Sequence, residues 1–207
     1  MMTIRAFSTL AASGALMSLL GAWAPAIAQT APAADAAPIA APAAAASAAA
    51  APAAPATAVP LAVADLILAD GKPAGTASIA IENGKAKLTI NFMGLPPGTH
   101  GLHIHTVGTC TAPDFASAGG HLNPGGHEHG TMNPKGSHMG DLSNIPVGPT
   151  GQVAGSMEML APPEALAEAL FDADGSSIVI HAGQDDYKTD PSGASGARIA
   201  CGVFRKA

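Results

Sequence analysis

Short segments that alternate apolar and polar residues recur through the C-terminal two thirds of the chain. The clearest pair, residues 77–81 and 85–88, flanks Glu82-Asn83-Gly84, and an Asn-Gly pair between two such runs is typical of a tight β-hairpin. We expect strands at residues 61–68, 75–81, 86–92, 100–105, 152–157, 177–181 and 198–204. Only residues 163–171 have the pattern of a helix.

Turn signals separate these segments, among them Asp70-Gly71, Pro96-Pro97-Gly98 and Asp174-Gly175. Many short strands at regular spacing, joined in places by long loops, indicate an all-β protein built as an antiparallel sandwich or barrel. We place this folded domain at residues 61–207, a length sufficient for one core. The sequence around Asp172 and Asp174 starts like a calcium loop but lacks the remaining oxygen ligands, so we interpret it as a turn.

The N-terminus has the layout of a secretory signal peptide, predicted at residues 1–28. Arg5 precedes an apolar run at residues 10–23, and the small-x-small sequence Ala26-Ile27-Ala28 follows it. An uncleaved membrane anchor is the alternative, but the run is shorter than the ~20 residues that a spanning helix needs. We therefore expect export and no membrane span in the mature protein.

Residues 29–60 consist almost entirely of Ala and Pro. Such a composition cannot bury enough apolar surface to offset chain entropy, so we predict a disordered linker. The chain as a whole carries a formal net charge of −6, which does not favour a nucleic-acid partner.

Seven of the eight histidines lie between His100 and His138, and the eighth, His181, stands in an apolar strand-like segment. His103 and His105 at i and i+2 of a strand point to the same face and could grip one ion. The following loop adds further donors, namely His121, His127, His129, His138 and Asp141. These are more nitrogen donors than one ion normally takes, so two metal ions are indicated.

The loop of residues 108–141 is long and rich in Gly and Pro, so its order must come from something other than a backbone ladder. Metal ligation would supply that order. The alternative is a flexible His-rich tract that buffers metal. A buffering tract, however, has no need of matched histidines on strands outside it.

Six motifs in this order carry a family resemblance: GLHIH, GGHLNP, HG, SHMGD, VIHAGQDDY and GARIACGV. Together they resemble a copper/zinc superoxide dismutase of the bacterial periplasmic type, over essentially all of residues 61–207. The resemblance implies a Greek-key antiparallel β-sandwich or barrel with long metal-binding and electrostatic loops. It also implies a periplasmic location, bound copper and zinc, and superoxide as the substrate. The products would be dioxygen and hydrogen peroxide.

The resemblance also implies the ligands of each metal. The copper ligands would be His103, His105, His121 and His181. The zinc ligands would be His121, His129, His138 and Asp141. His121 would then bridge the two ions, and four imidazoles suit copper while three imidazoles and a carboxylate suit zinc. His127 has no counterpart in this pattern, and we expect an exposed loop residue there.

Supporting residues follow from the same resemblance. Asp185 would accept hydrogen bonds from His103 and His129 and so fix their rings. His100 would brace the copper strand without binding metal. The two cysteines of the chain, Cys110 and Cys201, would form a disulfide; two unpaired buried thiols are the alternative, which export disfavours.

The family resemblance implies that Arg198 lies at the copper entrance, where it would separate an enzyme from a passive metal-binding protein. With a net charge of −6 the chain repels a small anion, so a cation at the copper entrance must attract it. Lys188 could add steering, although an ordinary exposed lysine fits as well. Ala194 stands where many relatives have asparagine. The alternative function is a non-catalytic copper and zinc binding protein on the same fold, and the resemblance allows either a monomer or a homodimer.

Overall fold

The computed structural model describes residues 58–207. The predicted signal peptide and nearly all of the predicted linker lie outside the described residues. The first strand, β1 (Val59–Leu68), begins two residues inside the range predicted for the linker. The long strands that follow are β2 (Pro73–Glu82), β3 (Lys85–Phe92), β7 (Val153–Glu158), β8 (Ser177–His181) and β9 (Arg198–Val203). Shorter ones are β4 (Gly98–His100), β5 (Leu102–His105), β6 (Ile145–Val147) and β10 (Arg205–Lys206).

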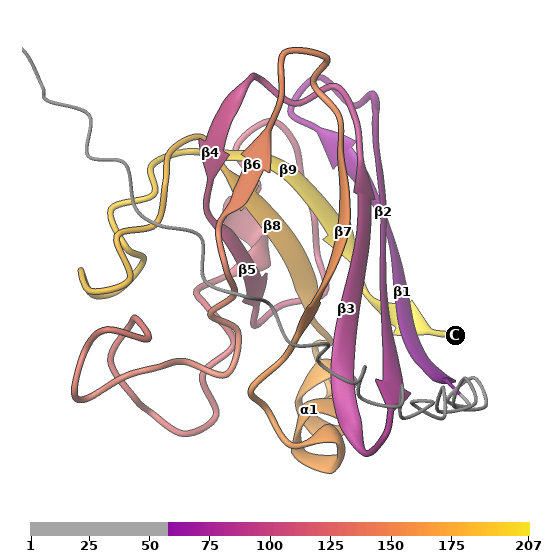
Figure 1. The fold of residues 1–207 in the computed structure, drawn as a ribbon, viewed down its shortest axis with the longest axis vertical. Coiled ribbons are helices and arrows are strands. Elements are labelled where there is room, and N and C mark those ends of the chain that lie inside the picture. Colours follow the sequence, from indigo (N-terminus) through magenta and orange to yellow (C-terminus); the bar gives the residue numbers. More distant parts are fainter. Residues whose placement is uncertain (1–57) are drawn as a thin grey trace, which may run out of the picture. The chain divides into compact units, whose positions relative to one another are not determined.

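Eight of these strands form one curled antiparallel sheet in the order β5-β8-β9-β1-β2-β3-β7, with β10 paired to β1 (Figure 1). The strands β4 and β6 form a separate two-stranded sheet. The predicted all-β class with antiparallel strands is therefore confirmed. Within residues 58–207 the α-helix is limited to α1 (Pro163–Leu170), and a single 3-10 turn, η1 (Ala116–Ala118), lies in the long loop after β5.

The β2–β3 hairpin forms where the sequence predicts it. Glu82 pairs with Lys85 across the turn, and both turn residues, Asn83 and Gly84, have positive φ (52° and 75°). Two positive φ values define the turn whose twist matches that of the flanking strands, and Asn-Gly adopts it at low cost.

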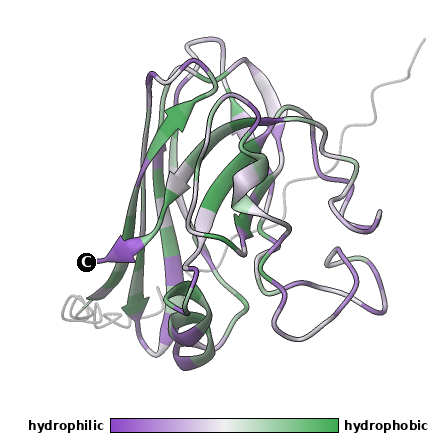
Figure 2. Ribbon diagram, turned by 180° about the vertical axis from the view of Figure 1, so that it is seen from behind, coloured by the Kyte–Doolittle hydropathy of each residue, from purple (hydrophilic) through white to green (hydrophobic). Residues whose placement is uncertain are grey.

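The core lies on the concave side of the curled sheet. Alternate residues of β1, β2 and β3 are buried, as the period-2 pattern predicts. The buried side chains of Leu166 and Leu170 bring α1 against the same core. In Figure 2 strongly hydrophobic residues follow the strands, whereas the long loops are mostly pale or hydrophilic. The loops therefore need polar contacts to become ordered.

Three local features differ from the sequence prediction. The segment predicted as one strand at residues 100–105 is divided between β4 and β5, because Gly101 bonds to Gly183 and His181 instead of continuing one ladder. The last predicted strand, at residues 198–204, ends at Val203, and the short strand β10 that follows it was not predicted. Strand β6 was not predicted, since it has three residues with Pro146 at its centre.

A second, smaller apolar cluster anchors the loop after β5. It contains Phe115, Ala118, Val179 and Cys201, all fully buried. The Cys110–Cys201 disulfide joins this loop to β9 across 91 residues, as the family resemblance implied. No helix within residues 58–207 has the length and apolar character needed to cross a membrane.

Candidate metal centre

Three neighbouring strands place the central side chains. On β5, Leu102 and Ile104 enter the core while His103 and His105 point to the opposite face. Strand β8 lies beside β5 and ends at His181, and Arg198 of β9 lies directly across from His181.

The long loop returns to β5 at two points. His121 forms a bridge with His105, and Asp141 forms a bridge with His103. Backbone hydrogen bonds between Ile104 and both Leu122 and Gly140 fix these approaches at 2.8 and 2.9 Å. The loop ligands predicted from sequence are therefore carried to the strand histidines by backbone pairing.

Four buried histidines form the first cluster, and their facing ring nitrogens lie within 4.8 Å of one another: His103, His105, His121 and His181. The Nε2 atoms of His105 and His181 are 3.4 Å apart. Within the described residues, the buried atoms Nδ1 of His103 and Nε2 of His121 have no hydrogen-bond partner. A buried ring nitrogen without a partner is costly, so the cluster has the lone pairs and the spacing to hold a metal ion.

The second ring nitrogen of each strand histidine forms a hydrogen bond to a group outside the cluster. His103 Nε2 donates to Asp185 Oδ2 at 2.7 Å. His105 Nδ1 donates to the Gly119 carbonyl at 2.9 Å, and His181 Nδ1 donates to the Gly196 carbonyl at 3.1 Å. Each bond fixes the tautomer that leaves a lone pair facing the cluster. This arrangement fits four imidazole ligands for copper.

Burial keeps three of these four histidines neutral in the metal-free protein. Desolvation lowers the pKa of His105 to about 2 and that of His181 to about 3. It also lowers the pKa of His121 to about 4, although Asp141 acts in the opposite direction. Because protonation is suppressed, the lone pairs remain available to a metal at neutral pH.

The second cluster converges on one carboxylate oxygen, Oδ1 of Asp141. The Nδ1 atoms of His121, His129 and His138 lie 2.9, 3.0 and 3.2 Å from it. The other oxygen, Oδ2, accepts the backbone N–H groups of Gly130 and His138 at 2.9 and 3.0 Å. Three imidazoles and a carboxylate around one point form the donor set of a closed tetrahedral zinc site.

His103 also belongs to a group of four ligand atoms that lie within 4.8 Å of one another and come from His103, His121, His129 and Asp141. His103 joins that group because its ring stacks on His121, with centroids 3.9 Å apart. Its Nε2 is already bonded to Asp185, and its Nδ1 is one of the two atoms without a partner in the first cluster. His138 has its Nδ1 directed at Asp141, so the geometry favours His138 in the second donor set.

Asp185 links the two clusters from behind. It is fully buried, and its Oδ2 and Oδ1 accept hydrogen bonds from His103 and His129 at 2.7 and 3.0 Å. Burial acts to raise the pKa of Asp185, but the two imidazoles outweigh it and hold the pKa below its usual range. A permanently ionised carboxylate therefore fixes one ring of each cluster.

Two residues that hold Asp185 were not identified from the sequence. Asn144 accepts the backbone N–H of Asp185 and donates to its carbonyl, both at 2.9 Å. Tyr187 donates its backbone N–H to Asp185 Oδ1 at 2.6 Å, and its hydroxyl accepts the N–H of Asn144 at 2.8 Å. The position of Asn144, three residues after Asp141, was the only signal, because the contacts span 41 residues.

Arg198 lies at the entrance of the first cluster. It lines a pocket of about 370 Å³ together with His105, His121 and His181. Its guanidinium donates to two neutral carbonyls, Phe115 O at 2.6 Å and Gly119 O at 2.5 Å. Burial lowers the pKa of Arg198, but an arginine remains charged at neutral pH. Lys188, the other cation considered for steering, is exposed and does not line this pocket.

The remaining histidines have simpler surroundings. The two ring nitrogens of His100 lie 2.8 and 2.9 Å from the carbonyl oxygens of His181 and Pro96, and these contacts tie β4 to the end of β8. His127 is exposed. Ala194 is exposed and has a positive φ of 50°, a conformation that asparagine adopts more readily than alanine.

Residues 74–204 match the sequence profile of the family described as copper/zinc superoxide dismutase (SODC). The chain belongs to that family. It is 43% identical over 149 residues to Superoxide dismutase [Cu-Zn] 2 of Aquifex aeolicus, covering 70% of this chain and 86% of the relative. It is 42% identical over 150 residues to Superoxide dismutase [Cu-Zn] of Caulobacter vibrioides, covering 70% and 85%.

Solved structures of the same family are also similar. The crystal structure of a superoxide dismutase-like protein from Bacillus subtilis is 41% identical, with a TM-score of 0.63 over 68% of this chain and 96% of that one. Cu/Zn superoxide dismutase from Brucella abortus is 32% identical, with a TM-score of 0.55 over 68% and 97%. The similarity to several copper/zinc superoxide dismutases supports an enzyme that uses copper and zinc.

Proposed function

We propose that the protein dismutes superoxide to dioxygen and hydrogen peroxide at a copper ion that His121 bridges to a structural zinc. One observation supports the assignment of His121 as the bridging residue. His121 has Nε2 without a partner in the four-histidine cluster, while its Nδ1 lies 2.9 Å from Asp141 Oδ1 in the second cluster. A single ring thus faces two donor sets. In this assignment the remaining ligands are those that the family resemblance implies.

Bound copper would supply one-electron oxidation and reduction of superoxide. His121 would hold one proton that the reaction needs. In the first half-reaction its Nε2 would take up a proton. In the second it would give that proton to the reduced oxygen species, which takes a second proton from water and leaves as hydrogen peroxide. A zinc ion held by the second cluster would add positive charge beside this ring and keep it a weak base, so that the proton can leave again.

The strand histidines and Asp185 would keep the geometry constant during turnover. The outward bonds of His103, His105 and His181 allow little ring rotation, because each acceptor is a backbone carbonyl or a buried carboxylate. Rigid ligands limit reorganisation between the two oxidation states. Arg198 would attract superoxide and orient it beside the cluster.

The alternative function is non-catalytic binding of copper and zinc. A relative from Bacillus subtilis that is 43% identical carries the name superoxide dismutase-like protein, so overall identity does not separate the two functions. The site itself favours the enzyme, because the four-histidine cluster opens into a pocket that contains Arg198. A protein that only stores metal has no need of a cation there.

The function is tested with three proteins: the wild type, His121→Ala, and His127→Ala as a matched control in the same loop. Copper and zinc are measured in each, and superoxide decay is followed by pulse radiolysis. We expect about one copper and one zinc per chain and rapid decay for the wild type and His127→Ala, with most of the rate lost in His121→Ala. A fully metallated wild type without activity would leave only the binding function.

We also propose that the chain is exported to the periplasm. Residues 1–28 have the layout of a signal peptide, and the Cys110–Cys201 disulfide suits an oxidising compartment. Cell fractionation tests this: the protein should appear in the periplasmic fraction, shortened at its N-terminus and without free thiols. Recovery in the cytoplasm at full length would contradict it.

A further inference from the structure

The entrance to the metal centre consists of two adjoining hollows. The pocket of about 370 Å³ that reaches the histidines and an outer hollow of about 750 Å³ share Gly120, Gly196 and Arg198. Apart from histidines, the residues that line them include two with a formal charge, Arg198 and Asp114. An anion that approaches Arg198 through the outer hollow therefore also meets the carboxylate of Asp114.

The local fold needs the oxygen of Asp114 but not its charge. Asp114 Oδ1 accepts the backbone N–H of Ala116 at 3.0 Å and so holds the turn that leads into η1. Asparagine makes the same turn with its amide oxygen. Asp114 is exposed, so its carboxylate is free to act on ions in the hollow.

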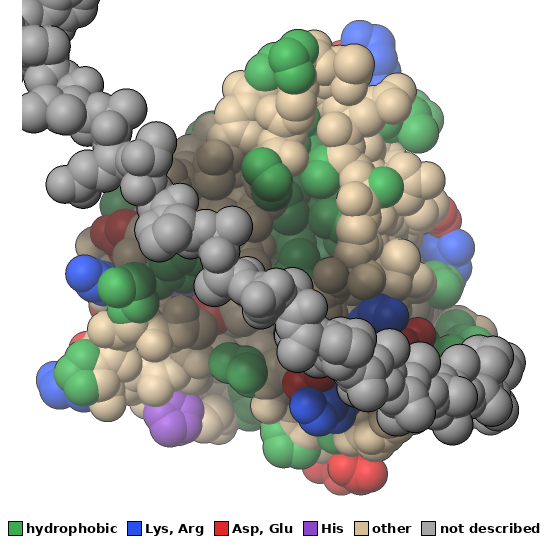
Figure 3. All heavy atoms as spheres, viewed as in Figure 1, with side chains coloured by type: hydrophobic (Ala, Val, Ile, Leu, Met, Phe, Trp, Pro, Cys, Tyr) green, Lys and Arg blue, Asp and Glu red, His purple; other side chains and the backbone are tan. Residues whose placement is uncertain are grey.

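The two charges oppose each other across the entrance. Within residues 58–207, Arg198 bonds only neutral carbonyls, Phe115 O and Gly119 O. The carboxylate of Asp114 is a charge that acts on this guanidinium. On the face seen in Figure 3 the charged side chains are scattered with mixed signs and form no single-sign patch. Among the residues that line the two hollows, Arg198 and Asp114 carry the formal charges other than those of histidines, so the local potential there depends strongly on this pair.

We propose that Asp114 is a specificity-determining residue that weakens the attraction of Arg198 for anions and does so most for dianions. This inference rests on the proposed function. A potential φ acts on an ion of charge z through zφ, so one carboxylate opposes a dianion twice as strongly as a monoanion. The cost is a slower encounter with superoxide, and the benefit is weaker competition from ions such as sulfate.

The size of the effect follows from Coulomb's law. A unit charge about 10 Å from the path of a monoanion, in a medium close to water, changes the encounter rate by about 1.5- to 2-fold where the screening length is ~30 Å. At ~0.15 M ionic strength, where the screening length is ~8 Å, the change is about 1.2-fold. For a dianion the fold-change in affinity is about the square of the monoanion value.

The test compares wild type, Asp114→Asn and Glu168→Gln. Glu168 is an exposed acid on α1 that lines neither hollow, so its substitution changes the net charge equally and serves as the control. Copper, zinc and melting temperature are checked in each protein. Superoxide decay is then measured from ~10 mM to ~0.15 M ionic strength. Inhibition by sulfate and affinity for azide, the latter from absorption titration, are measured at fixed ionic strength.

We expect Asp114→Asn to react about 1.5- to 2-fold faster at ~10 mM ionic strength, to converge toward wild type as salt rises, and to bind sulfate with a larger gain than azide. Glu168→Gln should match wild type. Equal values for Asp114→Asn and Glu168→Gln at every ionic strength would overturn the proposal. If metallated wild type showed no turnover, the proposed function would fail, and the azide affinity, titrated with and without sulfate, would still decide the role of Asp114.

Discussion

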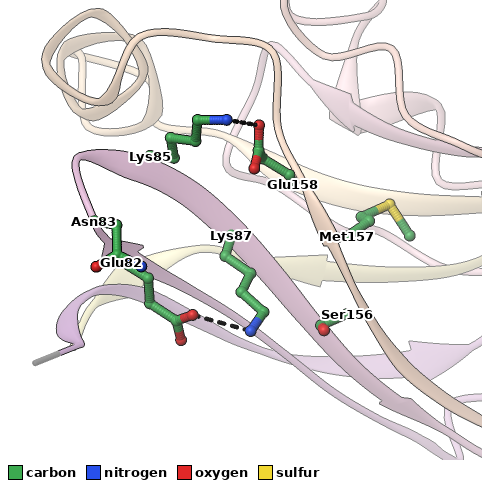
Figure 4. A pocket seen from close by; sticks show the side chains of 7 residues that line it. All are labelled: Glu82, Asn83, Lys85, Lys87, Ser156, Met157 and Glu158. Atoms are coloured by element: carbon green, nitrogen blue, oxygen red, sulfur yellow. Dashed lines mark hydrogen bonds and ion pairs between the residues drawn. The ribbon is translucent and has the colours of Figure 1, made fainter. Parts of the chain in front are cut away.

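Two pockets of this protein treat positive charge in opposite ways. On the sheet surface, Lys85 bonds Glu158 at 2.6 Å and Lys87 bonds Glu82 at 2.9 Å, so each cation of that pocket has an acid beside it (Figure 4). At the metal centre, the guanidinium of Arg198 bonds two neutral carbonyls and, within residues 58–207, no acid. Asp114 shares the outer hollow with it without forming an ion pair.

The difference reflects how each region becomes ordered and whether it also has to bind ions. The sheet is ordered by its backbone ladder and its apolar core, and its paired surface charges add little. The metal centre buries six histidines, three on strands and three on the long loop, together with the side chains of two carboxylates. The long loop is held largely by polar bonds that also prepare a binding site. The cation beside that site, Arg198, bonds neutral carbonyls.

Lowering the pH should have the largest effect on the difference between the two regions, because protonation adds positive charge to buried histidines of the metal centre. In the metal-free protein the pKa values of His105, His181 and His121 are about 2, 3 and 4, against ~6.5 in the unfolded chain. As pH falls below ~6.5 the unfolded state binds protons first, so the free energy of unfolding decreases by up to ~4 kcal/mol per pH unit for three sites.

Other groups do not reverse this sign between pH 7 and 5. Asp141 and Asp185 have lowered pKa values and lose their stabilising effect only below ~4. Burial lowers the pKa of His129, but Asp141 and Asp185 raise it to about 9, so its contribution is lost only on the alkaline side. Urea unfolding of chelator-treated protein at pH 7, 6 and 5 measures the effect, and equal midpoints would disprove it.

Removing a ligand of the second cluster should have the next largest effect. His138→Ala takes away one donor beside Asp141, so zinc should be lost from the purified protein. Binding that requires the folded state stabilises it by about 3 kcal/mol when the ligand is at ~100 times its dissociation constant. The melting temperature should therefore fall by about 6 to 12 °C.

His127→Ala serves as the control for this experiment, because His127 is an exposed histidine of the same loop. It should retain zinc and melt with the wild type. Unchanged zinc content and melting temperature in His138→Ala would show that its assignment to the zinc site is wrong.

Reversing the charge at the entrance should affect the rate without removing metal. Arg198→Glu should lower the superoxide decay rate about 10-fold or more at ~10 mM ionic strength, equivalent to about 1.4 kcal/mol, and Arg198→Gln should lose less. The wild-type rate should fall with salt. Pulse radiolysis with metal analysis checks this, and equal rates in all three proteins would remove Arg198 from the mechanism.

Breaking a pair in the sheet pocket should have the smallest effect. Lys85→Met removes an exposed ion pair with Glu158, so we expect a change in the free energy of unfolding below about 1 kcal/mol. Metal content and superoxide decay should match wild type. A rate change comparable to that of Arg198→Gln would show that the two regions are not independent.

The sequence predicted most of the sheet because its signals are local. The alternation of apolar residues and the Asn83-Gly84 turn operate within a few residues, and the structure has strands and a hairpin there. Strand β6 was not predicted, because its three residues, centred on Pro146, are all apolar and too few to show an apolar/polar alternation. They pair with β4, which is distant in sequence.

In the candidate site, too, the local features could be predicted and the contacts between distant residues could not. Strand alternation predicted that His103 and His105 face one ion, and the structure places them in one cluster with His121 and His181. Two features could not be predicted: the hydrogen bonds between Asn144 and Asp185, and the contacts of Arg198 with backbone carbonyls. They join residues that lie 41 to 83 positions apart in the sequence. The ligand roles stay predictions until metal is measured.

The disulfide has a consequence for the survival of the protein after proteolysis. The Gly- and Pro-rich stretch between Gly119 and Gly140 has many exposed residues, which are the sites that proteases cut first. Cys110 and Cys201 enclose that stretch, so a single cut leaves both fragments covalently joined. The fragment that ends in the loop keeps His103 and His105, and the other keeps His181, yet neither can diffuse away. A nicked molecule would run as one chain until it is reduced, and it could re-form its metal centre without having to find its other half.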